Sequence, residues 1–326
     1  MLISRRALMI AAGASVVAGP VLAADAAGPT PVERHGKLSV RGNQVIDAHG
    51  QPVTLRGMSL FWSQWGPRFY NADAIGWLAR DWKASLLRVA VAVPSGGYLQ
   101  HPARETAKAE RAIDAAIANG LYVIVDWHAH DPEPEAAATF FTHIATKYGH
   151  LPNIIYEPWN EPLEHHTWPV DVKPYHMALI PRIRAIDPDN LIVAGTPRWS
   201  SDVDVAAADP LPFDNVAYVM HFYATSHGQA YRDKVTRAME RGAAVFVTEY
   251  GTTEATGDGV IDAEETQAWW DFMEANHISY ANWSLNDKRE SAAALVRGAP
   301  AIGGWTDAHI TRSGKMVRDQ LRRMAT

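Results

Sequence analysis

The chain of 326 residues contains no cysteine. This absence excludes disulfides, a thiolate nucleophile and any zinc site built on thiolates. Positive charge is also sparse: 30 Lys and Arg stand against 36 Asp and Glu, and no segment gathers the basic residues. Because proteins that bind nucleic acid present a concentrated basic surface, we expect no nucleic acid partner.

A glycine-rich phosphate loop is missing as well. The first long apolar strand, predicted at residues 53–60, leads into Phe61-Trp62-Ser63-Gln64. A doubly wound nucleotide-binding sheet needs glycines at that turn, so this fold is disfavoured. Hydrophobic residues make up 47% of the chain and there are 12 tryptophans. This composition is ample for one large core, with flat apolar faces to spare for ligands.

Stretches that predict strands and stretches that predict helices alternate along the chain. A hairpin is expected first, at residues 37–40 and 44–46, around a Gly42-Asn43 turn. Eight strands are predicted after it, at 53–60, 86–91, 121–127, 154–156, 191–194, 216–220, 244–247 and 279–283. Helices are predicted after them at 71–82, 102–119, 133–148, 172–186, 201–208, 229–241, 263–276 and 315–324. Eight such units predict an α/β fold, a single (β/α)8 TIM barrel with a short N-terminal β-hairpin.

The N-terminus has the pattern of a targeting segment. Arg5-Arg6 precedes an apolar run at residues 7–18 and a small-residue stretch ending at Ala24. We interpret residues 1–24 as a twin-arginine-like or general secretory export signal, 25–35 as a loose segment and 36–326 as the catalytic barrel domain. A membrane anchor is the alternative, but about 17 apolar residues rich in Ala and Gly are marginal for a span. We therefore expect a periplasmic or secreted bacterial protein with no stable membrane insertion.

Polar residues gather at the predicted carboxyl ends of the strands, where barrel enzymes place their active sites. The candidates are Gln64, Trp65, Arg88, Asp126, His128, Asn160, Glu161, Trp199, His221, Tyr223, Glu249, Trp283, Lys288 and Glu290. Glu161 lies between Pro158 and Pro162, which stiffen the backbone around it. Taken alone, it could equally be a solvated turn residue. Arg88 interrupts an apolar strand and needs partners, which carboxylates from the fourth and seventh strands could provide.

Glu161 and Glu249 are the pair that glycoside hydrolysis requires. One carboxyl must protonate the leaving oxygen, and the other must attack the sugar carbon or activate water. We expect Arg88 and Tyr223 to favour the ionised form of Glu249, and the pKa of Glu161 to be raised by that negative charge. Exposed tryptophans suit sugar rings, whose C–H faces stack on flat apolar surfaces.

A metal-dependent barrel hydrolase is a competing interpretation, because His128-Ala129-His130 has ligand spacing at a strand end. His221 would be a further ligand. Amidohydrolase-like barrels usually carry this pair after the first strand, whereas here it follows the third, and Glu249 and Tyr223 suit acid–base work better. His165-His166 has no partner pattern and is expected at the solvated surface.

Together these motifs resemble glycoside hydrolase family five, and within it the bacterial endoglucanase (cellulase) branch. The resemblance covers residues 36–325 and rests on motifs at each strand end, among them Leu-Leu-Arg88-Val, Asp126-Trp-His128, Trp-Asn160-Glu161-Pro, His221-Phe-Tyr223, Thr-Glu249-Tyr-Gly and Asn-Trp283-Ser. One departure is Phe61, where the branch often has His, which leaves chain-length preference open.

The resemblance implies retention of configuration, with Glu161 as acid/base, Glu249 as nucleophile and their carboxyl groups about 5–5.5 Å apart. It implies that Asn160 binds the sugar 2-hydroxyl, that Arg88 and Tyr223 hold Glu249, and that His221 supports Glu161. The implied substrate-binding residues are Trp65, His128, Trp199, Trp283, Lys288 and Glu290. It also implies a non-proline cis peptide after Trp283.

These expectations together describe a retaining endo-β-1,4-glucanase that needs no metal or other cofactor and acts as a monomer on a β-glucan. A β-mannanase or mixed-linkage glucanase on the same scaffold is the nearest alternative. An inactive carbohydrate-binding barrel is the alternative of a different class, although both glutamates are present.

Overall fold

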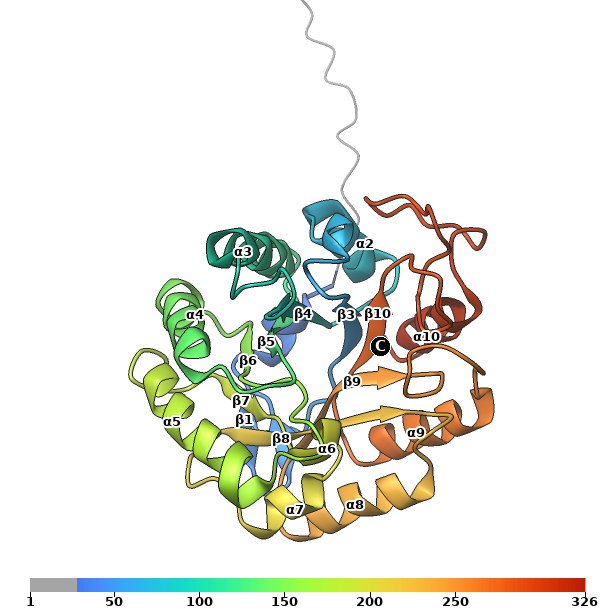
Figure 1. The fold of residues 1–326 in the computed structure, drawn as a ribbon. Helices are drawn as coiled ribbons and strands as arrows, with labels where there is room; N and C mark the ends of the chain where they lie inside the picture. The colour runs from blue at the N-terminus through green and yellow to red at the C-terminus, as the bar shows by residue number, and fades with distance from the viewer. Residues whose placement is uncertain (1–27, 326) are drawn as a thin grey trace, which may run out of the picture.

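The computed structural model describes residues 28–325, and the export signal predicted at 1–24 lies outside them. Eight parallel strands close into a barrel in the order β10-β3-β4-β5-β6-β7-β8-β9. Figure 1 looks into this barrel, with the strands at the centre and the helices in a ring around them. The predicted (β/α)8 architecture is confirmed.

The ten strands begin within three residues of the predicted positions. The hairpin is β1 (Ser39–Arg41) and β2 (Gln44–Ile46), and the barrel strands are β3 (Arg56–Leu60), β4 (Leu86–Ala92), β5 (Tyr122–His128), β6 (Ile154–Glu157), β7 (Leu191–Ala194), β8 (Val216–Tyr223), β9 (Val245–Gly251) and β10 (Tyr280–Leu285). Strands β8 and β9 extend three and four residues beyond their predicted ends. The polar residues there belong to the sheet itself.

Most of the helices cover the outside of the barrel. The helices are α1 (Pro31–His35), α2 (Ala72–Arg80), α3 (Pro102–Ala118), α4 (Pro134–Tyr148), α5 (Lys173–Arg184), α6 (Pro197–Ser200), α7 (Val203–Ala208), α8 (Gln229–Glu240), α9 (Ala263–Ala275) and α10 (Arg312–Arg323), with a 3-10 turn η1 (Pro67–Phe69) and a π turn η2 (Trp168–Val172). Among the described residues no helix is both long enough and apolar enough to span a bilayer.

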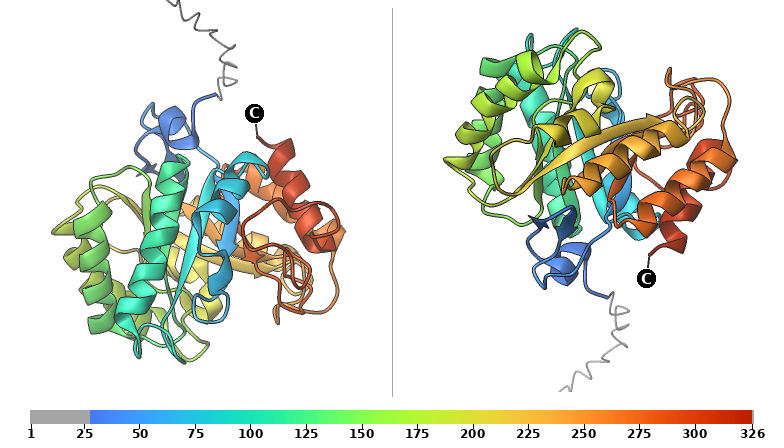
Figure 2. Two further views of the ribbon diagram at one scale, coloured as in Figure 1. Left: turned by 90° about the horizontal axis from the view of Figure 1, so that it is seen from above. Right: turned by 90° about the horizontal axis from the view of Figure 1, so that it is seen from below.

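The segment expected to be loose up to residue 35 is partly helical, and this prediction is corrected. Thr30 caps α1: its hydroxyl accepts from the Glu33 amide while the Glu33 carboxylate accepts from the Thr30 amide. This reciprocal pair satisfies two amides that would otherwise lack partners. Figure 2 shows α1 and the β1–β2 hairpin, in blue, at one end of the barrel.

Alternation along the strands separates two cores. In β4, Leu86 faces the barrel interior with Tyr122 and Ile155, whereas Leu87 and Val89 pack outward against the helices. Because side chains alternate with a period of two, the next inward positions toward the carboxyl ends carry the polar residues. The apolar floor of the barrel therefore ends where the candidate site begins.

Candidate active site

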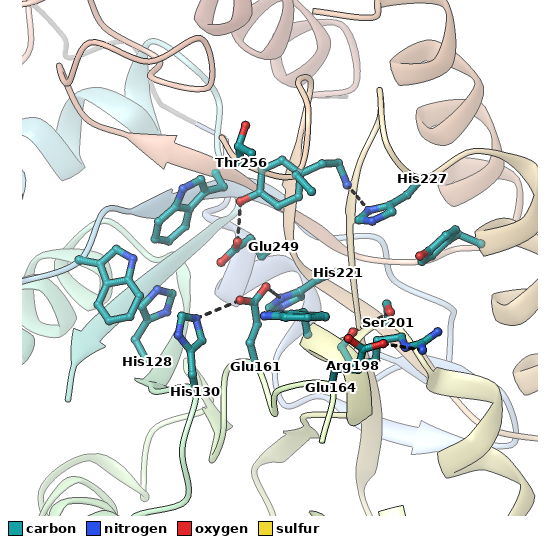
Figure 3. Close-up of a pocket in the computed structure, with 16 residues that line it drawn as sticks. His128, His130, Glu161, Glu164, Arg198, Ser201, His221, His227, Glu249 and Thr256 are labelled. Carbon is teal, nitrogen blue, oxygen red and sulfur yellow. Dashed lines mark hydrogen bonds and ion pairs between the residues drawn. The ribbon is translucent and has the colours of Figure 1, made fainter. Parts of the chain in front are cut away.

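A cavity of about 690 Å³ opens at the carboxyl ends of the barrel strands. Figure 3 shows the side chains of Glu161 and Glu249 close together in it, with His221 beside them. The lining residues are Trp62, His128, His130, Glu161, Glu164, Arg198, Trp199, Ser201, His221, Tyr223, His227, Tyr231, Glu249, Ala255, Thr256 and Trp283. Seven of the predicted site residues meet here, from six different barrel strands or the loops that follow them.

Glu249 reaches the cavity because β9 carries an irregularity. The register with β8 shifts between the pairs Val219–Phe246 and His221–Glu249, so β9 has one residue more than its neighbour. A bulge of this kind lets two successive side chains serve one face. Thr248 and Glu249 both enter the polar cluster as a result.

The carboxylate of Glu249 is held at both oxygens. Arg88 Nη1 donates to Oε2 at 2.8 Å, and the Tyr223 hydroxyl donates to Oε1 at 2.8 Å. The orientation expected from the resemblance is therefore present in the geometry.

Arg88 lies beneath the cavity and is fully buried. Besides Glu249, it donates to Glu157 Oε2 at 2.7 Å and to Asn160 Oδ1 at 2.6 Å, and it pairs with Asp126 at 3.0 Å. The prediction that carboxylates from the fourth and seventh barrel strands hold Arg88 is confirmed, but the fourth-strand carboxylate is Glu157. Sequence reasoning missed Glu157, although it occupies the inward position two residues after Ile155.

Asn160 keeps one half of its amide free. Its Oδ1 is fixed by Arg88, whereas its buried Nδ2 has no partner within the described residues. An oriented, unpaired donor is what recognition of a sugar hydroxyl would use, since a buried donor gains most when a ligand satisfies it.

Glu161 has a histidine on each carboxylate oxygen. His221 Nδ1 lies 3.0 Å from Oε1, and His130 Nε2 lies 3.3 Å from Oε2. Dashed lines mark both contacts in Figure 3. His130 was not among the predicted site residues; the only signal for it was its place in the His-x-His motif. A carboxylate oxygen of Glu161, one of Glu249 and a His221 nitrogen all lie within 4.8 Å of one another.

The tautomer of His221 follows from its other neighbours. The Thr248 hydroxyl donates to Glu157 Oε1 at 2.6 Å, so its oxygen accepts from His221 Nε2 at 2.8 Å. His221 Nδ1 then shares a proton with Glu161. Burial alone would lower the pKa of His221, but its contacts with Glu157 and Glu161 raise it to about 9.

The expected order of the two glutamate pKa values is wrong for this site. Burial would raise the pKa of Glu161, but hydrogen bonds from His130 and His221 lower it to about 2. Burial and the charge of Glu161 raise the pKa of Glu249 despite the opposing effects of His221, Arg88 and Tyr223. The prediction weighed the charge of each carboxylate, with Arg88 and Tyr223 beside Glu249, but placed no histidine hydrogen bonds on Glu161, and these lower its pKa below that of Glu249.

The predicted sugar-binding residues divide into two groups. His128, Trp199 and Trp283 line the cavity, and the His128 ring stacks on Trp283 with centroids 5.0 Å apart. His128 Nδ1 lies 2.6 Å from Asp126, which fixes its ring. The Trp283–Ser284 peptide is cis, as the resemblance implied.

Trp65, Lys288 and Glu290 lie outside the cavity lining. Trp65 is 60% exposed and its ring lies 5.3 Å from that of Trp62. Lys288 pairs with Glu290 at 2.6 Å and its ammonium lies over the Phe61 ring.

Phe61 fills its position by apolar packing, since its ring lies 5.3 Å from that of Trp283. Lining residues that sequence reasoning did not single out include Trp62, His227 and Tyr231.

Two groups among the described residues have the spacing to hold a cation. One is Glu161, His221 and Glu249, where Arg88 already supplies positive charge. The other is Asp131, His165 and His166. There His166 Nδ1 accepts from the Leu163 amide, so the neutral ring carries its proton on Nε2, facing Asp131. That nitrogen has no lone pair to offer a metal.

A parallel eight-stranded barrel with two neighbouring carboxylates at its mouth is the arrangement that glycoside hydrolases use, with one carboxyl as the acid and the other as the nucleophile or base. The chain belongs to glycosyl hydrolase family 5: the family model "Cellulase (glycosyl hydrolase family 5)" matches residues 46–289.

Curated relatives and solved structures agree with this family. Endoglucanase N of Pectobacterium atrosepticum is 43% identical over 94% of this chain and 70% of its own length, and endoglucanase Z of Dickeya dadantii is 48% identical over 86% of this chain and 65% of its own. The chain thus spans about two thirds of the length of these relatives. The catalytic domain of Thermobifida fusca endoglucanase Cel5A with cellotetraose has a TM-score of 0.86 at 38% identity, covering 90% of this chain and 99% of that one.

Proposed function

We propose that this protein is a retaining endo-β-1,4-glucanase that cleaves internal bonds of cellulose or soluble β-glucans. The observation that carries the proposal is the pair of glutamates whose carboxylate oxygens lie within 4.8 Å of each other. That separation favours direct attack by one carboxylate, because a water molecule placed between them would need a wider gap.

In the first step, the Glu249 carboxylate attacks the anomeric carbon while Glu161 gives a proton to the glycosidic oxygen. The C–O bond to the leaving sugar breaks, and a glycosyl ester forms on Glu249. Before this step, His221 carries the proton, because it is cationic below its raised pKa and its Nδ1 lies 3.0 Å from Glu161 Oε1. Transfer of that proton to Glu161 leaves His221 neutral.

In the second step, Glu161 accepts a proton from water as the water oxygen attacks the same carbon. The ester bond to Glu249 breaks, so two inversions restore the original configuration. We assign Arg88 and Tyr223 to hold Glu249, Asn160 to bind the 2-hydroxyl, and His128, Trp199 and Trp283 to bind the sugar rings. Trp65, Lys288 and Glu290 are assigned to more distant sugars.

The substrate assignment is tested by comparing carboxymethyl-cellulose, mixed-linkage β-glucan and galactomannan. We expect cellulose chains to be cut internally, with a fall in viscosity that precedes release of most reducing ends. Faster hydrolysis of galactomannan would make the protein a β-mannanase, and binding without hydrolysis would make it a carbohydrate-binding barrel.

Glu161→Gln and Glu249→Gln are the essential variants in that assay. Both should lose nearly all activity on the polysaccharide. Glu110→Gln is the matched control, because Glu110 lies on α3 and pairs with His143 and Lys147 at the surface. Wild-type rates in both active-site variants would overturn the assignment of the pair.

We also propose export of the protein, with residues 1–24 as the signal and 36–326 as one monomeric catalytic domain. Amino-terminal sequencing of the protein recovered outside the cytoplasm tests the cleavage, and size-exclusion chromatography with light scattering tests the monomer.

A further inference from the structure

Two hydrogen bonds hold the backbone around Glu161 to β5 and the residue that follows it. The Asn160 amide donates to Trp127 O at 3.1 Å, and the Glu161 amide donates to Ala129 O at 3.2 Å. These bonds continue the sheet for a short distance past the end of β6. They fix the amides of the stretch and leave its carbonyl groups to other partners.

The carbonyl groups on either side of Glu161 are taken by α6. The Ser200 hydroxyl donates to Asn160 O at 2.6 Å, and the Trp199 amide donates to Pro162 O at 2.7 Å. One contact precedes Glu161 and the other follows it. The residue is therefore tied to a segment that lies about forty positions further along the chain.

The segment that makes these contacts has an unusual backbone. Residues 198–200 all have left-handed φ values, 57° at Arg198, 52° at Trp199 and 54° at Ser200, although none is glycine. Side chains of L-residues disfavour this region, and successive non-glycine residues there are rare. Such backbone persists where surrounding contacts over-determine it, and it is concentrated at functional sites.

Ser200 is the residue that joins this left-handed turn (residues 198–200) to Glu161. Its side chain is fully buried, its oxygen accepts from the Thr196 amide at 3.3 Å, and its hydroxyl proton goes to Asn160 O. Gly195 allows the close approach, since a Cβ there would lie 2.1 Å from Trp159 O. The turn also carries Trp199, which is 43% exposed and lines the cavity.

We propose that Ser200 is a positioning residue for the acid step: its hydroxyl, presented by the left-handed turn, holds the Asn160–Pro162 backbone so that Glu161 can reach the glycosidic oxygen. Sugar stacking on Trp199 and the placement of Glu161 are then linked through one short segment. The proposal rests on the function proposed above, and it assigns Ser200 no contact with substrate.

The test separates the acid step from the rest of catalysis. Cellopentaose has a poor leaving group that needs a proton, whereas 2,4-dinitrophenyl β-cellobioside releases a phenolate that departs without one. We expect Ser200→Ala to lower kcat/KM for cellopentaose by about tenfold or more, since general acid catalysis contributes about 10²–10⁴-fold in total. The value for the dinitrophenyl substrate should stay within about twofold of the wild type.

Ser200→Gly distinguishes the hydroxyl from the strain. Glycine adopts left-handed φ freely, so this variant relieves the backbone but still lacks the hydroxyl, and we expect the same selective loss as in Ser200→Ala. Ser313→Ala is the matched control, because Ser313 is equally buried and, within residues 28–325, its hydroxyl bonds only to that of Thr252, away from the Glu161 stretch. Equal losses on both substrates, or no loss on cellopentaose, would overturn the proposal.

A measurement without turnover separates this proposal from the proposed function. The pKa of His221 can be followed by imidazole NMR, and contact with Glu161 helps to raise it. If Ser200 holds Glu161 in place, the His221 pKa is lower in Ser200→Ala than in the wild type and unchanged in Ser313→Ala. A wild type that cleaves neither substrate would refute the function, while an unchanged His221 pKa in Ser200→Ala would refute the role of Ser200.

Discussion

Replacing Tyr223 by Phe removes one hydrogen bond to the proposed nucleophile and little else. The Tyr223 hydroxyl donates to Glu249 Oε1 at 2.8 Å, and burial keeps its own pKa well above the ordinary value, so it remains a donor throughout the working pH range. Arg88 still holds the other oxygen of Glu249 in the variant. The expected effect is therefore on the ionisation of Glu249, with its position largely preserved.

The size of the effect follows from the strength of that bond. A hydrogen bond to a charged group contributes about 1.5–3 kcal/mol, and a shift of one pKa unit corresponds to about 1.4 kcal/mol. Tyr223 lowers the pKa of Glu249, so its removal should raise that pKa by about 1–2 units. Glu249 must be ionised to attack, so activity is lost at a higher pH on the acidic side.

The assay is the pH dependence of kcat/KM on 2,4-dinitrophenyl β-cellobioside, which reports the free enzyme and needs no proton from Glu161. The acidic limb should move up by about 1–2 pH units, with a smaller loss on the plateau. Tyr156→Phe is the control, since it removes a buried 2.7 Å bond to Asp187 on the outer side of the barrel. An acidic limb that stays in place, or moves down, would refute the electrostatic role of Tyr223.

Three further perturbations test other parts of the site. Arg88→Met leaves Asp126, Glu157 and Glu249 without their buried cation, and urea denaturation should show a loss of about 3–5 kcal/mol; a loss below about 1 kcal/mol would show that the carboxylates need no cation. Glu249→Gln removes a carboxyl whose pKa is raised on folding, mainly by burial and also by the charge of Glu161. The wild type loses stability as pH rises through that pKa, so the Tm of the variant relative to the wild type should increase from pH 5 to pH 8. A relative Tm that decreases over this range would contradict the raised pKa of Glu249. Dialysis against EDTA should leave the rate on carboxymethyl-cellulose unchanged, and a loss restored by added divalent cation would favour the metal-dependent alternative.

The barrel could be predicted because each strand is a short apolar run bounded by turn residues. The ends of β8 and β9 could not, because His221, Tyr223 and Glu249 are polar and resemble loop residues until the neighbouring strand pairs with them. The extra residue in β9 is likewise a property of the pairing. By contrast, α1 has a local signal in the sequence, because Thr30 and Glu33 have the spacing of a capping box.

The site could be predicted where a residue type needs a partner. A buried Arg88 demands carboxylates, and the structure supplies three. Glu157 was recoverable from strand alternation once Ile155 was placed in the barrel interior. His130 was not, because its contact with Glu161 depends on how the loop after β5 turns over the barrel mouth.

The order of the Glu161 and Glu249 pKa values could not be predicted from the sequence, because it depends on contacts that form only in the fold. Two carboxylates alone would repel, and the one farther from Arg88 would keep its proton. In the folded chain Glu161 lies between His130 and His221, so the proton moves from the carboxyl to the imidazoles. To act as the acid, Glu161 must therefore receive a proton from His221. This transfer requires the two groups to stay in hydrogen-bond contact, as they are at 3.0 Å between His221 Nδ1 and Glu161 Oε1. Pro158 and Pro162 restrict the backbone around Glu161 and so help to keep its carboxyl in that position. Hydrogen bonds between this backbone stretch and the segments at β5 and α6 also hold Glu161 in place. Loss of the Ser200 hydroxyl should therefore slow the acid step while the fold remains stable.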